Sequence, residues 1–373
     1  MSLSTDDLRR LDALYETLRE KSENQLGYPV NLNYDYSDLY RFFAFTINNV
    51  GDPFQNGLYR INTREFEREI LAFFAELYHA PRDDFYGYVT NGSTEGNIYG
   101  LYLAREAFPK GLLYYSGDTH YSIPKAARLL KIPAVVVASQ ENGEMDYAAL
   151  EEKLQANGQE PPIIVANIGT TMKGAVDRPE EILRILERNS IREFYIHCDA
   201  ALGGLVLPFL DRAPLFDFRL PIGSVCVSGY KMLGAPMPCG IVLARKSDVE
   251  RIKEHIEFLD IPDTTIAGSR NGHSVLFLWY SLRKLGVEGF REMLQDCIRV
   301  KEYALARLSE ISRRAYANEY SIVVIIKRPS VEVTKKWQLA VQGDIAHIVF
   351  MPHVSTKHID ALMEDLRKER GLL

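Results

Sequence analysis

Residues 162–199 read PIIVANIGTTMKGAVDRPEEILRILERNSIREFYIHCD and predict a strand, a helix and a second strand. The two ends of this stretch, 163–167 and 194–199, are short and nearly continuously apolar, which is typical of strands buried on both faces of a sheet. Residues 179–189 between them form an amphipathic helix. The stretch therefore predicts one unit of an α/β domain with a largely parallel sheet.

The same pattern continues on both sides of this unit. Further short apolar strands are expected at residues 112–116, 134–138, 224–228 and 240–244, and another amphipathic helix at 147–155. In an open sheet of this kind, ligand sites lie outside the carboxyl ends of the strands. Residues that directly follow the predicted strands are therefore the first candidates for a functional site.

A helix and an α+β region flank this core. The chain opens with an amphipathic helix that either packs on a partner subunit or covers the protein's own core, since apolar residues recur at helical spacing at Leu8, Leu11, Leu14, Tyr15 and Leu18. After Gly272 we expect helices at 274–284 and 289–312, strands at 321–327 and 346–351, and a last helix at 357–369. These elements predict an N-terminal helix and arm (1–50), a large domain (51–272) and a small C-terminal domain (273–373).

The composition is that of an ordinary globular protein. With 373 residues, 46% of them hydrophobic, and a formal net charge of −6, the chain can build a large core but lacks the basic surface of a nucleic-acid-binding protein. Residues 1–10 do not resemble a secretory signal, and the longest apolar stretch, 200–210, is far shorter than the ~20 residues that cross a bilayer. Four widely spaced cysteines predict reduced thiols in a cytoplasmic protein and suggest no metal site.

The first candidate site is residues 90–97, TNGSTEGN, which lie between an apolar segment and a helical run. Glycines let backbone N–H groups approach an anion, the hydroxyls of Ser93 and Thr94 add donors, and the helix N-terminus adds the positive end of its dipole. The pattern matches neither the common nucleoside-triphosphate loop nor the dinucleotide loop. It indicates either a phosphate site or a simple N-capped turn.

Three further candidates follow predicted strands. Asp199 can hold a protonated ring nitrogen, with the small Ala201 leaving room for a flat ring, or it caps a turn. Lys231 comes shortly after Ser228 at the end of a strand and can form a Schiff base with an aldehyde, or it is a surface lysine. His120 can stack on an aromatic ring or transfer a proton, or it is an ordinary loop histidine.

Taken together, these residues favour one cofactor. A phosphate site, a histidine, a strand-end carboxylate and a strand-end lysine occur in that order along one predicted sheet. Pyridoxal 5′-phosphate needs an anion site, a contact for its ring face, a counter-ion for its pyridinium and an amine for its aldehyde. The sequence therefore predicts a pyridoxal-phosphate site.

The chain resembles the pyridoxal-phosphate-dependent group II amino acid decarboxylases, in particular the branch of bacterial histidine decarboxylases and plant serine decarboxylases. The most specific motifs are residues 88–97 (YVTNGSTEGN), 167–171 (NIGTT) and 268–273 (GSRNGH), supported by 26–29 (LGYP), 46–49 (TINN) and 342–347 (QGDIAH). Segments 51–54 (GDPF) and 337–340 (WQLA) look closer to the plant serine enzymes.

The resemblance implies fold type I architecture and an obligate homodimer with its active site at the subunit interface. It also implies that Ser93 and Thr94 bind the phosphate, that His120 stacks on the pyridine ring and that Asp199 pairs with the ring nitrogen. The predicted cofactor site further includes Ala201 and Ser228.

The remaining implied roles concern the reactive edge of the cofactor. Thr170 or Thr171 would approach its phenolic oxygen, and Lys231 would form the internal aldimine. Ser269 would reach the phosphate of the neighbouring subunit's cofactor. The implied reaction is decarboxylation of an L-amino acid, with serine or histidine favoured, to the amine and carbon dioxide.

Two positions depart from the family pattern. Tyr230 precedes Lys231 where relatives usually carry His, and Phe258 lies in a loop where a Tyr that protonates Cα is expected. Because Phe has no proton to give, either His120 or Tyr230 is the proton donor, or the chain is an aldehyde synthase that performs oxidative decarboxylation and deamination. A catalytically weak, cofactor-binding partner protein is the remaining alternative.

Overall fold

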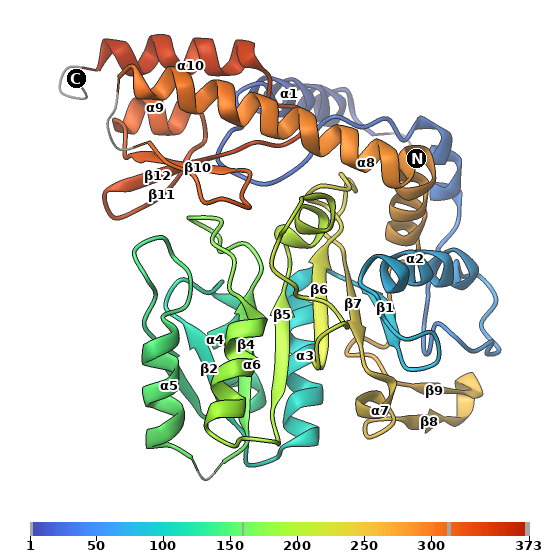
Figure 1. The fold of residues 1–373 in the computed structure, drawn as a ribbon. Coiled ribbons are helices and arrows are strands. Elements are labelled where there is room, and N and C mark those ends of the chain that lie inside the picture. Colours follow the sequence, from blue (N-terminus) through green and yellow to red (C-terminus); the bar gives the residue numbers. More distant parts are fainter. Residues whose placement is uncertain (1–2, 159, 312–314, 370–373) are drawn as a thin grey trace.

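Seven strands form the central sheet of the computed structural model, which describes residues 3–158, 160–311 and 315–369. They are β1 (Tyr86–Thr90), β2 (Leu112–Ser116), β3 (Ala134–Val137), β4 (Pro162–Asn167), β5 (Tyr195–Asp199), β6 (Ser224–Ser228) and β7 (Gly240–Ala244). Across the sheet the order is β1-β7-β6-β5-β4-β2-β3, and every neighbouring pair is parallel except the two that contain β7. The predicted, largely parallel α/β sheet is therefore confirmed (Figure 1).

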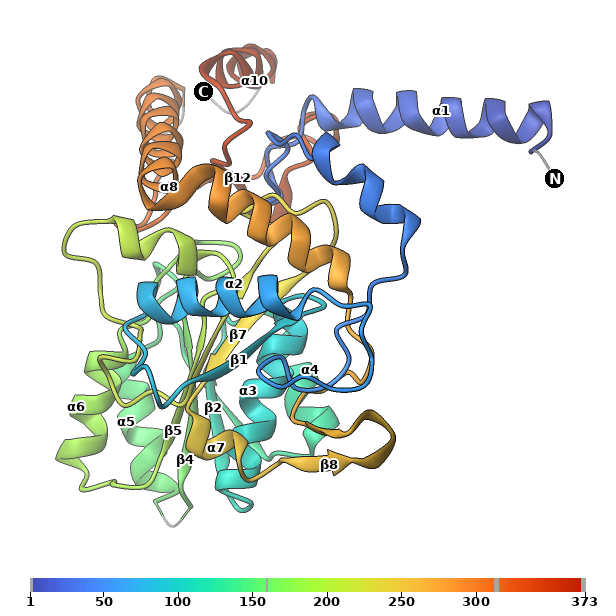
Figure 2. The ribbon, with the colours of Figure 1, turned by 90° about the vertical axis from the view of Figure 1, so that its right-hand side faces the viewer.

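Helices pack on both faces of this sheet (Figure 2). One face holds α3 (Ser93–Ala107) and α4 (Ser122–Leu130), and the other holds α5 (Tyr147–Ala156) and α6 (Pro179–Arg188). Strands β4, β5 and β6 are buried along their whole length, as their apolar sequences predict. The same expectation is wrong for β3, which is largely exposed because it is the last strand of the sheet and pairs only with β2.

Most predicted boundaries agree with the structure to within two residues. The two helices expected at 274–284 and 289–312 form the two halves of α8 (Gly272–Ser309), and they are separated at Gly286, whose φ of 60° and ψ of −175° are not helical. The predicted end at Ser312 lies outside the described residues. The sequence prediction also missed a hairpin of β8 (Glu254–Ile256) and β9 (Ile261–Asp263), which follows the short helix α7 (Lys246–Val249).

The C-terminal region builds the small α+β unit that the sequence predicts. Its antiparallel sheet has the order β10-β12-β11, formed by β10 (Val323–Lys327), β12 (Ile345–Val349) and β11 (Ala340–Gln342). The helices of this unit are α9 (Val331–Lys336), α10 (Thr356–Lys368) and the second half of α8, which packs against α10 and β10. The helix α2 (Arg64–Leu77) packs against α8 and also against strands β1 and β7 of the large sheet.

The N-terminal arm joins this small unit to the large sheet. Leu26 exchanges backbone hydrogen bonds with Trp337 and Val349, and the N–H of Asn31 donates to the carbonyl of Lys231 at 3.1 Å. A Cβ at Gly27 would lie 2.3 Å from the carbonyl oxygen of Gln338, so only glycine allows this close approach. The arm then continues into the 3-10 helix η1 (Ser37–Ala44).

Helix α1 (Thr5–Ser22) extends away from the rest of the chain (Figure 2). None of its described residues is buried, and the predicted apolar stripe is exposed at Leu8, Leu11, Leu14, Tyr15 and Leu18. The alternative that this helix covers its own core is therefore wrong. An exposed apolar helix face of this kind is typical of a contact with another protein surface.

The cysteines behave as the sequence predicts. All four are buried and free, and burial raises the pKa of the Cys198 thiol above its ordinary value. Within the described ranges, no helix combines the length and the apolar character needed to cross a membrane.

Candidate functional site

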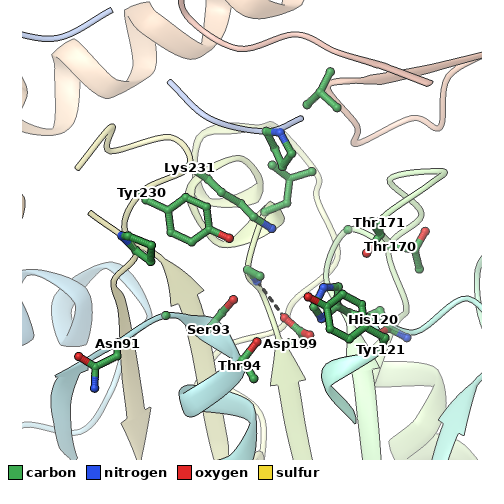
Figure 3. Close-up of a pocket in the computed structure, with 18 residues that line it drawn as sticks. Asn91, Ser93, Thr94, His120, Tyr121, Thr170, Thr171, Asp199, Tyr230 and Lys231 are labelled. Carbon is green, nitrogen blue, oxygen red and sulfur yellow. Dashed lines mark hydrogen bonds between the residues drawn. The ribbon is translucent and has the colours of Figure 1, made fainter. Parts of the chain in front are cut away.

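A cavity of about 200 Å³ lies at the carboxyl ends of β4, β5 and β6 and at the N-terminus of α3 (Figure 3). It is the position at which open α/β sheets bind ligands. The cavity is lined by Pro29, Asn91, Gly92, Ser93, Thr94, His120, Tyr121, Asn167, Gly169, Thr170, Thr171, Asp199, Ala201, Leu202, Tyr230, Lys231, Pro238 and Val349. Pro29 and Val349 show that the N-terminal arm and the small C-terminal unit complete the wall.

The N-terminus of α3 forms one end of the cavity. Gly92 precedes the helix with φ 126° and ψ 163°, a conformation that is essentially restricted to glycine. No side chain caps this helix, which contradicts the alternative of a simple N-capped turn. Because the first N–H groups of a helix have no intrahelical acceptor, Ser93 and Thr94 can offer both backbone N–H and hydroxyl donors to an anion.

Asp199 ends β5 and enters the cavity from below in Figure 3. Its Oδ1 accepts a hydrogen bond from the N–H of Ala201 at 3.2 Å, and its Oδ2 accepts one from the amide of Asn97 at 2.8 Å. Both carboxylate oxygens therefore have a fixed hydrogen-bond donor. The buried carboxylate is thus oriented before any ligand binds.

Lys231 enters the cavity from the opposite side, three residues after β6 ends. Burial lowers the pKa of its amine below the ordinary value, and the Asp199 carboxylate partly opposes this shift. A lowered pKa increases the fraction of neutral amine, the form that attacks an aldehyde. Tyr230 lies beside Lys231 in the cavity wall, and burial raises the pKa of its phenol, which keeps the proton on the hydroxyl.

His120 lines the cavity in the turn before α4. Its Nδ1 is 2.7 Å from the hydroxyl oxygen of Ser122 and also accepts the Ser122 N–H at 3.3 Å. Burial lowers the pKa of the imidazole, and Asp199 acts in the opposite direction. The ring is therefore biased towards its neutral form, which can lie against a flat aromatic ligand.

The other predicted residues divide into two groups. Thr170, Thr171 and Ala201 line the cavity, whereas Ser228 lies behind the wall and donates a hydrogen bond to the hydroxyl of Ser93 at 2.9 Å. Ser269 lies outside the cavity, is exposed, and accepts a hydrogen bond from Asn48 at 3.1 Å.

Phe258 also lies away from the cavity. It belongs to the 3-10 turn η4 (Glu257–Leu259) at the tip of the β8–β9 hairpin, and 79% of its surface is exposed. In Figure 1 this hairpin projects from the large domain on the side away from the small C-terminal unit. A single chain therefore does not bring Phe258 or Ser269 to its own cavity.

The sequence analysis missed two buried residues beneath the cavity, Asn97 and His197. Asn97 is one helical turn after Ser93, and His197 is two positions before Asp199 on the same face of β5. These spacings, four in a helix and two in a strand, put each residue on the same side as a predicted site residue. The spacing could therefore have predicted that both residues face the site, but it could not have predicted the hydrogen bond between them.

The cavity fits pyridoxal phosphate by the chemistry of its donors. It combines uncapped helix N–H groups with two hydroxyls at one end, an oriented carboxylate in the middle and an amine of lowered pKa opposite. These groups match the anion site, the ring-nitrogen partner and the aldehyde partner that the cofactor needs. Among the described residues, no group of three or more His, Cys, Asp or Glu side chains could hold a metal ion.

Known proteins match both the sequence and the fold. Residues 62–328 match the family model described as the pyridoxal-dependent decarboxylase conserved domain. Serine decarboxylase 3 of Oryza sativa subsp. japonica is 44% identical over 353 residues, which cover 94% of this chain and 79% of the rice protein. A histidine decarboxylase of Acinetobacter baumannii is 44% identical over 369 residues, which cover 98% of this chain and 96% of that protein.

A solved structure agrees with these relatives. The L-methionine decarboxylase of Streptomyces sp.590, in its internal aldimine form, superposes with a TM-score of 0.89 at 28% identity over 98% of this chain and 95% of that chain. The match of family model, sequence and fold confirms the expected family and the expected cofactor. The chain therefore belongs to the pyridoxal-dependent decarboxylase family and is a pyridoxal-phosphate-dependent amino acid decarboxylase of fold type I.

Proposed function

We propose that this enzyme converts L-serine or L-histidine to the corresponding amine and carbon dioxide. The observation that supports these substrates most strongly is the 44% identity, over nearly the whole chain, to proteins named serine decarboxylase and histidine decarboxylase. Serine is our first candidate.

We assign the site residues as follows. When bound, pyridoxal phosphate supplies an electron-accepting ring for the electron pair that is left as carbon dioxide departs. Ser93, Thr94 and the α3 N-terminus hold the phosphate, and Lys231 holds the aldehyde carbon through Nζ. Asp199 keeps a proton on the ring nitrogen, because an ionic partner in a site of low dielectric stabilises the charged form. His120 covers one ring face, and Thr170 or Thr171 approaches the phenolic oxygen.

The proton that replaces the carboxylate at Cα is assigned to His120 or Tyr230. Tyr230 keeps its proton because burial raises the pKa of its phenol, and it lies next to Lys231. His120 accepts hydrogen bonds at Nδ1, so its Nε2 carries the proton of the neutral ring. Replacing each residue separately, with Tyr230→Phe and His120→Asn, and measuring amine formation identifies the donor.

We further propose that the enzyme is a cytoplasmic homodimer with a shared site, divided into residues 1–50, 51–272 and 273–373. The exposed apolar face of α1 supports a subunit contact, since it lacks a partner within its own described chain. Ser269 and Phe258 lie away from their own cavity, as expected of residues that act at a neighbouring subunit. The free, buried cysteines support a reducing compartment.

An aldehyde synthase is the alternative, and the specific observation that favours it is Phe258. A phenyl group at the tip of the β8–β9 hairpin has no proton to deliver to Cα. The alternative reaction consumes molecular oxygen and water, and it yields aldehyde, carbon dioxide, ammonia and hydrogen peroxide.

One panel of assays tests these proposals together. The purified, pyridoxal-phosphate-loaded enzyme is incubated with the common L-amino acids, and carbon dioxide, amine, ammonia and peroxide are measured separately. We expect amine and carbon dioxide in equal amounts from serine or histidine, and neither from Lys231→Ala. Peroxide and ammonia in step with carbon dioxide would refute the decarboxylase proposal in favour of the aldehyde synthase. Carbon dioxide from neither amino acid would refute the substrate assignment.

A further inference from the structure

Asn97 is a buried amide beneath the cavity whose hydrogen-bonding capacity is fully used. Its exposed surface is 1%. Its Nδ2 donates to Asp199 Oδ2 at 2.8 Å and to Ser122 Oγ at 2.9 Å. Its Oδ1 is 2.8 Å from His197 Nε2 and 3.0 Å from Cys226 Sγ. An amide has two donor hydrogens and two acceptor lone pairs, so every one of them has a partner here.

The Asp199 carboxylate can only accept, so Nδ2 of this amide faces Asp199 and Oδ1 faces His197. Burial lowers the pKa of the His197 imidazole to about 4, so the ring is neutral at physiological pH and carries one N–H. Because the Asn97 carbonyl oxygen can only accept, that N–H is on Nε2, and Nδ1 accepts from the Ser224 hydroxyl at 2.7 Å. Burial also keeps the Cys226 thiol protonated, since it raises the thiol pKa. Both neighbours therefore donate to Oδ1 and hold the amide in this orientation.

The Asn97 amide is also linked to His120 through the hydroxyl of Ser122. Ser122 Oγ accepts from Asn97, so its own hydrogen is free to donate to His120 Nδ1 at 2.7 Å. The Ser122 N–H donates to the same nitrogen at 3.3 Å. Nδ1 of His120 is therefore an acceptor, and the ring proton is on Nε2. One amide thus contacts the strand-end carboxylate directly and the histidine through Ser122.

We propose that Asn97, held in place by His197, is a positioning residue that orients the Asp199 carboxylate and keeps His120 in its Nε2-protonated form. This inference rests on the proposed pairing of Asp199 with the ring nitrogen of pyridoxal phosphate. An amide N–H can only donate, so it fixes the direction in which Oδ2 of Asp199 points. Because the Asp199 carboxylate can only accept, the hydrogen bonds run in one direction, from the Ser224 hydroxyl through His197 and Asn97 to Asp199.

The most direct test is Asn97→Asp, which keeps the side-chain shape and replaces the donor facing Asp199 by an acceptor. Two carboxylates at this distance cannot both be ionised, so they share a proton, and one of the two has a raised pKa. The matched control is Asn189→Asp, because Asn189 also donates to a carboxylate, Glu151 Oε1 at 2.9 Å, and accepts from an amide, but lies between α5 and α6.

The readouts are the dissociation constant of pyridoxal phosphate, followed by quenching of protein fluorescence, and the absorbance of the bound cofactor between pH 5 and 9. We expect the affinity of Asn97→Asp to fall about tenfold or more at pH 8 and to recover towards acid pH, since a bond to a charged group is worth about one to two powers of ten. The other titrating groups around Asp199 are His120, Lys231, His197 and Cys226. They are unchanged in both variants, so only the introduced carboxylate can add this pH dependence.

A second pair of variants covers the case in which Asn97→Asp does not fold. His197→Gln retains a side-chain N–H that can reach Asn97 Oδ1, whereas His197→Leu removes it. We expect the glutamine variant to keep an absorbance-against-pH curve close to that of the parent enzyme and the leucine variant to shift it. Indistinguishable curves for leucine, glutamine and parent proteins, or an Asn97→Asp protein that behaves like Asn189→Asp, would overturn the positioning role.

Asp199→Ala separates this inference from the proposed function on which it rests. If this variant binds pyridoxal phosphate with the affinity and absorbance of the parent, Asp199 does not pair with the ring nitrogen, and both proposals are wrong. If Asp199→Ala loses affinity while Asn97→Asp does not, the assignment of Asp199 stands and the positioning role of Asn97 is wrong.

Discussion

Replacing Asp199 by Asn tests how much of the catalytic power depends on one buried charge. The amide has nearly the shape of the carboxylate, so the cavity is retained while the negative charge is removed. In the parent enzyme, the Ala201 N–H donates to Oδ1 of Asp199 and the Asn97 amide donates to Oδ2. The NH2 group of the new asparagine must therefore face one of these two donors. With the proposed pairing, the ring nitrogen of the cofactor would lose its ionic partner, and the electron-accepting form would become less stable.

The size of the effect follows from the burial of this site. Two opposite charges about 4 Å apart attract each other by about 4 kcal/mol at the effective dielectric constant that describes most protein sites. Since each 1.36 kcal/mol is tenfold in rate, kcat/KM should fall by about a thousandfold. The assay is carbon dioxide release from the best amino acid of the panel, with cofactor in excess so that weaker binding does not contribute.

The double variant Asn97→Asp/Asp199→Asn is the structural control. It restores one amide and one carboxylate at hydrogen-bond distance but moves the negative charge from the strand end to helix α3. We expect it to regain thermal stability relative to Asp199→Asn without regaining activity. A loss of less than about tenfold in kcat/KM for Asp199→Asn would refute the argument that this charge drives the reaction.

Three further predictions follow from the geometry. Gly92→Ala should weaken pyridoxal-phosphate binding about tenfold in a fluorescence titration, because a φ of 126° strains any residue other than glycine. The added carbon itself meets nothing within 4 Å. Unchanged affinity would show that the N-terminus of α3 does not hold the phosphate. Burial lowers the pKa of His197 from 6.5 to about 4, so the unfolded protein binds a proton at this residue before the folded protein does. The free energy of unfolding therefore decreases as the pH falls from 6.5 to about 4, by at most about 3 kcal/mol. His197→Gln should remove that part of the acid dependence in urea unfolding, and an identical pH profile would contradict the burial argument. Leu11→Lys with Leu14→Lys on the exposed face of α1 should shift the enzyme to monomers in sedimentation velocity, whereas Glu20→Lys on the opposite face should not.

Local patterns in the sequence predicted most of the large domain because its strands are central and its helices are amphipathic. Strands β4, β5 and β6 have apolar residues on both faces and are buried throughout, so pattern and burial agree. The β8–β9 hairpin has no such pattern, because its strands are only three residues long and β8 is mostly exposed. The break between the two halves of α8 at Gly286 was predicted, because glycine readily adopts the positive φ found there.

The candidate site was predictable where the chemistry follows directly from a strand end or a helix start. Ser93, Thr94, Asp199 and Lys231 were identified in this way, and all four line the same cavity. The roles of Asn97 and His197 were not predictable, because each depends on hydrogen bonds between residues that are about a hundred positions apart in the chain. Sequence spacing cannot specify such contacts.

Local side-chain patterns predicted most strands and helices of the large domain and the candidate residues Ser93, Thr94, Asp199 and Lys231, because these patterns extend over only a few residues of the chain. Only the tertiary structure decided how the cavity is closed and how its charges are held. Pro29 from the arm and Val349 from the small sheet complete the wall, and Asn97 fixes the carboxylate of Asp199. The physical reason is that hydrogen bonds and packing act over a few ångströms in space, whatever the distance along the chain.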